Sequence, residues 1–164
     1  MGLFSRKKEA PAPTASVPQY KSLFFECSKG FRGYKRYRLT TYGYEPTQRG
    51  IDALKIPNPK HDVDPEADKY IFDLIGKQVE IRLLLNNDTT MPVLVDGNQI
   101  GTYFAYTDEE KQLVHDFANG GIESVHVRIE WTQKNIISTD KKGKLKANAE
   151  ERYNSYLFVK RPEA

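Results

Sequence analysis

The chain has 164 residues, of which 38% are hydrophobic, 12% aromatic and 29% charged. About 150 residues per domain is typical, so we expect one domain, and this aromatic content excludes a wholly disordered chain. The single cysteine excludes a disulfide framework, and no apolar run reaches the roughly 18 residues of a membrane-spanning helix.

Positive charge is concentrated in the first part of the chain. Residues 1–60 carry 12 Lys and Arg against 4 Asp and Glu, whereas residues 61–164 carry 13 against 18, which gives the net charge of +3. This asymmetry favours an anionic partner near the basic part. The alternative, that both parts fold together and mix their charges on one surface, stays open.

The N-terminal residues read as a tail. Residues 1–19 are basic at first and then contain Pro11, Pro13 and Pro18 among Ala, Ser and Thr, so they bury too little apolar surface to offset the entropy of ordering. They lack the apolar segment of a secretory signal, and Arg6 stands where a myristoylation motif needs Ser or Thr. We therefore expect a disordered tail over 1–19, one domain over 20–164, and a cytoplasmic protein that does not bind membranes.

Two strands and two helices are expected next. Residues 20–26 read as a strand, and residues 34–41 as a second strand with Tyr37 and Leu39 on one face and Arg36 and Arg38 on the other. A short helix is expected around residues 48–55. Asp64 followed by Pro65 predicts a helix start, and apolar residues at helical spacing extend that helix to Gly76.

The middle of the chain carries the clearest local signals. Residues 78–85 alternate between apolar and polar, which predicts a half-buried strand. Asp96-Gly97 lies between apolar runs at 91–95 and 98–104 and predicts a hairpin with a two-residue turn. Thr107 and Glu110 form the pattern of a capping box, so a helix is expected to follow and to end at Gly120-Gly121.

The last part alternates again over residues 125–131, passes through a polar, lysine-rich excursion at about 134–150, and returns as a final strand over 151–160. No strand–helix units repeat. The pattern therefore predicts an α+β fold, with a curved, mostly antiparallel sheet or a small open β-barrel and two helices.

Patterns of catalytic or metal-binding residues are missing from the sequence. None of the three histidines has a second His or Cys at ligand spacing, and no nucleophile elbow, phosphate-binding loop or dinucleotide fingerprint occurs. Cys27 is interpreted as a small core residue, because no base accompanies it in sequence. We expect no enzyme activity, no cofactor and no metal.

A basic and aromatic segment is the main positive signal. Lysine and arginine neutralise phosphates, and aromatic rings stack on unpaired bases, so this segment favours nucleic acid as a partner. The alternative is a solvated strand face whose tyrosines pack inward. The candidate nucleic-acid-binding residues of the segment are Arg32, Tyr34, Lys35, Arg36, Tyr37 and Arg38.

Residues 77–131 resemble the HIRAN domain. The resemblance is carried by the strand from Val79, the loop ending at Asp88, the hairpin and Ile100-Gly101, in the family's order, with a helix and a strand following. Met91-Pro92 replaces the small apolar pair of the family. HIRAN domains of fork-remodelling helicases hold single-stranded DNA ends, so the resemblance implies Asp88 near a terminal hydroxyl and a groove wall at Arg36 and Tyr37.

Two functions follow as hypotheses. The first is a non-catalytic nucleic-acid-binding module, for single-stranded DNA or DNA ends, with Asp88 joining the basic and aromatic segment. The second is a protein-interaction or accessory module, bacterial or phage-encoded, whose sheet edge or tail meets a protein partner. The sequence leaves the choice between DNA and RNA, and the oligomeric state, open.

Overall fold

The computed structural model describes residues 19–41 and 45–163, without the side chains of 133–138 and 146–151. The tail expected over residues 1–19 lies outside the described residues, except for Gln19. The elements in chain order are β1 (Tyr20–Glu26), β2 (Lys35–Leu39), α2 (Glu45–Leu54), β3 (Ile56–Pro57), α3 (Lys60–Val63), β4 (Tyr70–Ile71), β5 (Gln78–Leu84), β6 (Thr90–Val95), β7 (Asn98–Phe104), α4 (Asp108–Ala118), β8 (Ser124–Thr139) and β9 (Leu145–Lys160).

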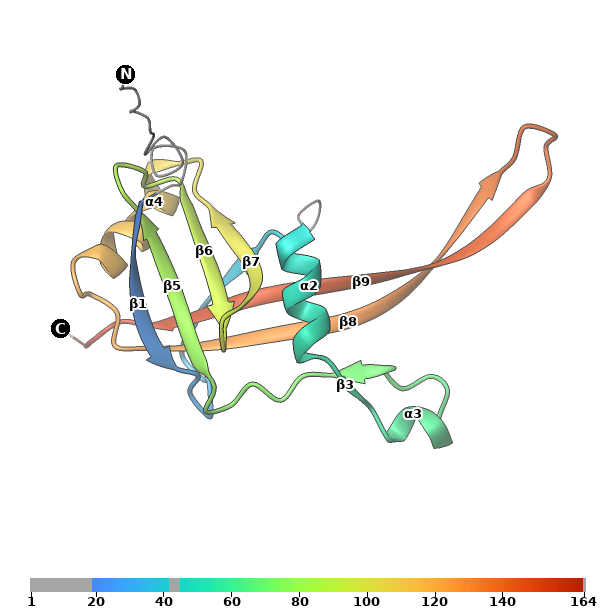
Figure 1. Cartoon of the computed structure of the whole chain (residues 1–164), viewed down its shortest axis with the longest axis horizontal. Coiled ribbons are helices and arrows are strands. Elements are labelled where there is room, and N and C mark those ends of the chain that lie inside the picture. Colours follow the sequence, from blue (N-terminus) through green and yellow to red (C-terminus); the bar gives the residue numbers. More distant parts are fainter. Residues whose placement is uncertain (1–18, 42–44, 164) are drawn as a thin grey trace, which may run out of the picture.

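Two antiparallel sheets form the body of the molecule (Figure 1). One has the strand order β1-β5-β6-β7 and the other β2-β9-β8, while β3 and β4 make a small third ribbon. Isolated bridges join the two larger sheets at Thr40–Thr102 and at Cys27–Val125. The sheets curve without closing into a barrel, so the predicted α+β fold with a curved antiparallel sheet is confirmed.

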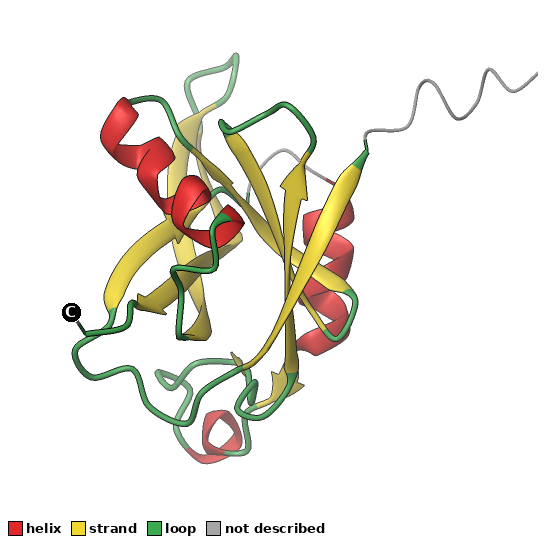
Figure 2. Cartoon of the chain, turned by 90° about the vertical axis from the view of Figure 1, so that its left-hand side faces the viewer, coloured by secondary structure: helices red, strands yellow, loops and turns green. Residues whose placement is uncertain are grey.

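The core lies between these sheets. Alternate residues of β5, β6 and β8, among them Val79, Val93 and Val127, are almost fully buried. The helix α4 adds Leu113, Val114 and Phe117 to the same cluster, and Phe25 of β1 meets the Phe117 ring edge-on at a centroid distance of 5.8 Å. Figure 2 shows the helices placed around the strands. The periodicity of each element therefore decides which face joins the core.

The local signals at the hairpin and at α4 are confirmed. Asp96 and Gly97 both have positive φ, 48° and 80°, as a two-residue hairpin turn requires. The Thr107 hydroxyl accepts from the Glu110 amide, and the Glu110 carboxylate accepts from the Thr107 amide. The short helix expected near 48–55 is α2, and it packs on β7 so closely that only a glycine fits at position 50.

The helix predicted over residues 64–76 is wrong. The Asp64 carboxylate accepts from the Glu66 amide and stabilises a turn there, so it does not begin a helix. Beyond it, Tyr70, Phe72 and Leu74 turn inward while the residues between them are exposed. Tyr70 and Leu74 fit both a period of 3.6 and a period of 2, and pairing of β4 with β3 selects the extended form.

The excursion expected over residues 134–150 is also corrected. β8 and β9 stay paired from Ser124–Lys160 to Thr139–Leu145, so the lysine-rich segment is the end of a long two-stranded ribbon. The core cluster includes Trp131 and its pairing partner Tyr153, and the two strands continue beyond them to Thr139 and Leu145.

Candidate nucleic-acid interface

The face of β2 that bears the arginines is exposed, as predicted. Tyr37 is half-buried and Leu39 is buried on the inner side, whereas Arg36 and Arg38 are exposed on the outer side of the β2-β9-β8 sheet. No carboxylate of the described residues lies within ion-pair distance of Arg36 or Arg38. These two cations are therefore open to an anionic ligand.

Strand pairing places each of these two arginines in a row of three side chains that crosses β2, β9 and β8. Arg36 faces Phe158 of β9, which in turn faces His126 of β8. Arg38 faces Tyr156, which in turn faces Arg128. Neighbouring strands are about 4.8 Å apart and alternate residues share a face, so the side chains of each row are adjacent.

Tyr156 lies among three arginines. The Arg36 guanidinium carbon is 5.1 Å from the centroid of the Tyr156 ring, and Arg38 and Arg128 occupy the paired positions on either side. Arg38 also donates to the Asn154 amide oxygen at 3.1 Å, and Arg128 pairs with Glu130 at 3.2 Å. A half-buried aromatic ring surrounded by cations is suited to stacking a base between phosphate contacts.

The loop before β2 crosses the end of this face. The ring of Phe31 stacks on His126 with centroids 4.7 Å apart, and it lies 4.5 Å from the Phe158 ring. Tyr34 shares a hydrogen bond of 2.7 Å with Ser124, which lowers the pKa of its phenol. Arg32, also in this loop, is exposed. We call Phe31, Arg36, Arg38, Arg128 and Tyr156 the basic sheet face.

Two of the predicted residues lie on the other side of β2. The Tyr37 ring meets Tyr103 edge-on at 5.7 Å, and its hydroxyl accepts from Arg161 at 3.2 Å. The Lys35 ammonium lies 5.4 Å from the centroid of that Tyr37 ring. Tyr37 is therefore held in a packed position away from Arg36 and Arg38, and Tyr156 of β9 lies beside these two arginines instead.

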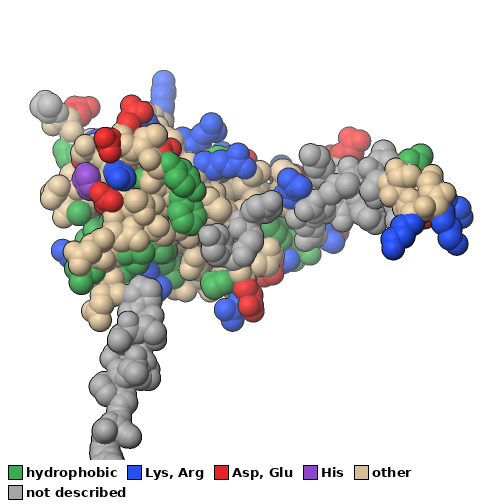
Figure 3. Space-filling model, turned by 90° about the horizontal axis from the view of Figure 1, so that it is seen from above, with side chains coloured by type: hydrophobic (Ala, Val, Ile, Leu, Met, Phe, Trp, Pro, Cys, Tyr) green, Lys and Arg blue, Asp and Glu red, His purple; other side chains and the backbone are tan. Residues whose placement is uncertain are grey.

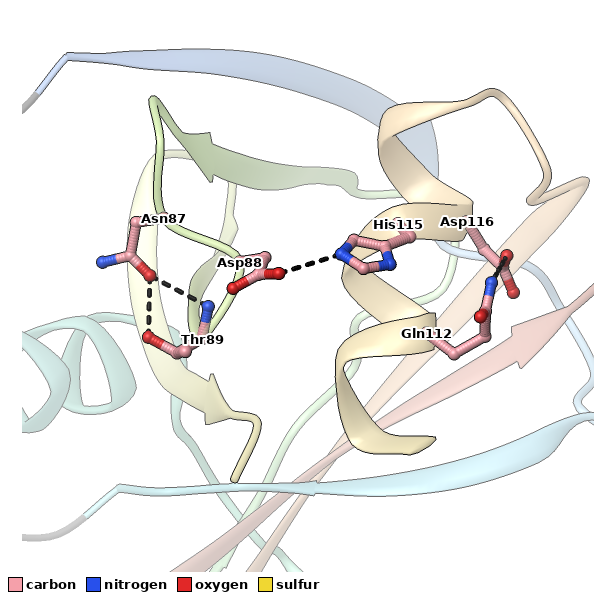
Figure 4. Close-up of polar contacts among 6 residues, drawn as sticks. All are labelled: Asn87, Asp88, Thr89, Gln112, His115 and Asp116. Atoms are coloured by element: carbon pink, nitrogen blue, oxygen red, sulfur yellow. Dashed lines mark hydrogen bonds and ion pairs between the residues drawn. The ribbon is translucent and has the colours of Figure 1, made fainter. Parts of the chain in front are cut away.

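Asp88 is held by the helix α4 (Figure 4). Its carboxylate accepts from His115 Nε2 at 2.9 Å, and this hydrogen bond lowers the pKa of Asp88. The amide and the hydroxyl of Thr89 both donate to the side-chain oxygen of Asn87, which shapes the loop. A cavity of about 380 Å³ lies beside Asp88, with Leu83, Val114 and Ala118 among its lining residues.

The structure does not bring Asp88 to the basic sheet face. Asp116 of α4 accepts from Arg161, which also donates to Tyr37. The helix that holds Asp88 therefore packs on the inner side of β2, whereas Arg36 and Arg38 are on the outer side. The two parts of the predicted site are separated by the sheet.

A groove of about 570 Å³ runs along the free edge of β8. It lies between that strand and the segment 68–75, and its lining carries both signs of charge, with Lys29 and Arg128 against Asp68, Asp73 and Glu130. Ser28 donates to the Val125 carbonyl, and the Val127 amide donates to Cys27 Sγ, so alternate backbone groups of β8 point away from β9. The backbone groups of Ile129 and Trp131 then face the groove.

The Cys27 thiol and the His126 ring are in contact, but the arrangement is not that of a nucleophilic thiol activated by a histidine base. The thiol sulfur is 3.6 Å from His126 Nδ1, but Nδ1 is also 2.7 Å from the Ser28 carbonyl oxygen. A carbonyl only accepts, so Nδ1 carries a hydrogen and donates it to Ser28. Burial raises the pKa of the Cys27 thiol, so the sulfur stays protonated at neutral pH. The interpretation of Cys27 as a buried core residue is confirmed.

Within the described ranges, no three His, Cys, Asp or Glu side chains gather as metal ligands, and none of the helices has the length and apolar character needed to cross a bilayer. Comparison with models of protein families, with curated proteins and with solved structures gives no match. The resemblance to the HIRAN domain thus stays a prediction.

The sequence reasoning missed Tyr156, Arg128 and Phe158. A signal was present, because the alternation in residues 125–131 and 151–160 already puts these three side chains opposite the core residues. The sequence alone did not indicate that β9 is the neighbour of β2, because residues that meet across these strands, such as Arg38 and Asn154, are 116 residues apart in the chain.

Proposed function

We propose that this chain is a non-catalytic module that binds single-stranded nucleic acid, with single-stranded DNA as the first candidate, on the basic sheet face. The observation that carries the proposal is the cluster of Arg36, Arg38 and Arg128 around the Tyr156 ring. The arginines would neutralise phosphates, and Tyr156 would stack on a base. The groove at β8 is less suited to a phosphate chain, because Asp68 and Asp73 repel it.

Fluorescence anisotropy with an end-labelled single strand tests the proposal at two salt concentrations. Arg36→Glu should weaken binding about 10-fold at low salt, and it should lower the slope of log K against log salt by about 0.7 or more. Arg49→Glu is the matched control, since it makes the same charge change at an exposed position of α2. Equal losses in the two variants would show a nonspecific charge effect and would refute the proposed face.

Tyr156 provides a second test that does not change the net charge. Removing one stacking ring costs about 1–3 kcal/mol per base, so Tyr156→Ala should weaken binding roughly 5- to 150-fold, whereas Tyr156→Phe keeps the ring and the affinity. Tyr106→Ala is the control, because Tyr106 is 82% exposed and lies outside this face. Unchanged binding by Tyr156→Ala would exclude stacking there.

Recognition of DNA ends is a separate part of the proposal, because it depends on Asp88. One carboxylate oxygen of Asp88 accepts from His115, which leaves the second for a terminal hydroxyl. A strand with a free 3′ end should then bind more tightly than a 3′-blocked strand, and Asp88→Asn should reduce that difference. Equal affinity of the wild-type protein for both strands would rule out end recognition.

The groove at β8 favours a second candidate function, a protein-interaction module. Its edge presents the backbone groups of Ile129 and Trp131, onto which an extended peptide can pair as an added strand. Such binding should change little with salt and should be indifferent to Arg36→Glu. A proline at position 129 should abolish peptide binding, because it removes the edge amide that pairing needs.

A further inference from the structure

The ribbon of β8 and β9 extends well beyond the body of the molecule (Figure 1). β2 covers β9 only at residues 155–159, whereas the two long strands stay paired out to Thr139 and Leu145. At about 3.3 Å per residue, the part from Thr132 to Thr139 projects about 25 Å. We call residues 132–152 the arm.

The turn at the end of the arm has a fixed backbone. The Asp140 carboxylate accepts from the amides of Lys142 and Lys144, each at 2.8 Å. The Gly143 amide donates to the Asp140 carbonyl at 3.0 Å, and Gly143 adopts a φ of 79°, which a glycine adopts without strain. These contacts occupy the one carboxylate of the turn with backbone donors.

The cations of the turn are exposed. Lys141, Lys142 and Lys144 are all exposed, and none of them has an ion pair with a described residue. Figure 3 shows lysine and arginine side chains gathered at the far end of the arm. Leu145, next to them, is 77% exposed. The arm therefore carries a compact positive tip beyond the body of the molecule.

We propose that the tip of the arm binds the phosphate backbone of duplex DNA next to the single strand held on the basic sheet face. A two-stranded ribbon is narrow enough to enter the major groove, where its lysines reach phosphates on either side. The inference rests on the proposed function, and it specifies the ligand as a junction between single strand and duplex. An anionic membrane is the competing ligand, but three lysines and one leucine give only weak membrane binding.

The test compares a short single strand, a duplex of the same length and a junction of the two, in the full chain. The tip variant is Lys141→Gln, Lys142→Gln and Lys144→Gln together. The control variant is Lys21→Gln, Lys60→Gln and Lys69→Gln, which removes the same charge from exposed positions on the body. All six positions are solvent-exposed, so both variants should fold, and circular dichroism checks this.

If each of the three lysines contacts one phosphate, the loss of affinity and the change in salt slope of the tip variant can be predicted. The tip variant should lose roughly 10- to 100-fold in affinity for the duplex and the junction, and its salt slope on them should fall by about 2 to 3. Its affinity for the single strand should stay within about twofold of the wild type. The control variant should keep the slope of the wild-type protein.

Several outcomes would overturn the inference. The tip has no such role if the wild-type protein ignores duplex, if both triple variants change the slope equally, or if the tip variant loses single-strand binding to the same degree. Tip-dependent binding to vesicles containing anionic lipid, without duplex binding, would assign the arm to membranes. If the wild-type protein binds duplex through the tip but does not bind single strands, the contact of the tip with duplex is supported. The proposed binding of a single strand on the basic sheet face is then refuted instead.

Discussion

The close contact between α2 and β7 predicts how Gly50→Ala changes the free energy of unfolding. The sign of that change shows whether packing or helix propensity dominates at this position. Gly50 lies inside α2 and is buried, and a Cβ placed there would be 2.0 Å from the Gln99 carbonyl oxygen and 2.7 Å from the Gln99 nitrogen. Those atoms belong to the backbone of β7, so they have no side-chain freedom with which to move aside. Gly50→Ala must therefore push α2 away from the sheet by more than 1 Å.

Two effects of opposite sign decide the magnitude. Alanine is favoured over glycine in a helix interior by about 1 kcal/mol. Overpacking costs about 1–3 kcal/mol and more against rigid backbone, and the shift also loosens Thr47 and Ile51, which are almost fully buried beside Gly50. We expect a net loss of about 2 kcal/mol or more in the free energy of unfolding.

Urea denaturation followed by circular dichroism measures this loss as a lower midpoint. Ala53→Gly, at an exposed position of the same helix, is the control and should cost about 1 kcal/mol from propensity alone. A Gly50→Ala variant more stable than the wild type would refute the close contact, because propensity would then act without opposition.

Three further predictions concern stability. Thr107→Ala removes the hydroxyl that caps α4 and should cost about 1 kcal/mol, while Thr107→Ser should cost little; urea midpoints that do not separate the two would exclude the cap's contribution. Phe117→Ala leaves a cavity under Phe25 and should cost about 3–5 kcal/mol, and a loss below 1 kcal/mol in the same assay would contradict its burial. Burial raises the pKa of Tyr103 to about 12, whereas the unfolded chain loses this proton near pH 10, so stability should fall between pH 10 and 12 by up to about 1.4 kcal/mol per pH unit. Tyr103→Phe should remove that part of the fall, and parallel stability curves for the two proteins would refute the shift.

The strands that the sequence predicted well are those with one unambiguous period. Residues 78–83 alternate strictly between polar and apolar, and Asp96-Gly97 needs a backbone that few other turns provide. The strands β5, β6 and β7 therefore fall within a residue or two of their expected bounds. The segment after Asp64 was mispredicted because Tyr70 and Leu74 fit both a helical period and the alternation that Phe72 completes, and only pairing with β3 decides between them.

The candidate interface was predictable on one strand only. Alternation placed Arg36 and Arg38 on one face, but nothing local to β2 indicates that β9 pairs with it. Tyr156 belongs to the site because of that pairing. Tyr37, which was predicted to belong to it, does not, because its contacts with Arg161 and Tyr103 hold it on the inner side of β2. The arm was missed for a similar reason, since a polar ribbon and a polar loop have the same composition.

Amide chemical shifts during titration with a short single strand of DNA test the central claim most directly. If the basic sheet face binds the strand, the largest shifts should come from Arg36, Arg38 and Tyr156, with Phe31 and Arg128 following. Shifts confined to Ile129 and Trp131 at the β8 groove, shifts confined to the loop of Asp88, or no shifts at low salt would contradict the account.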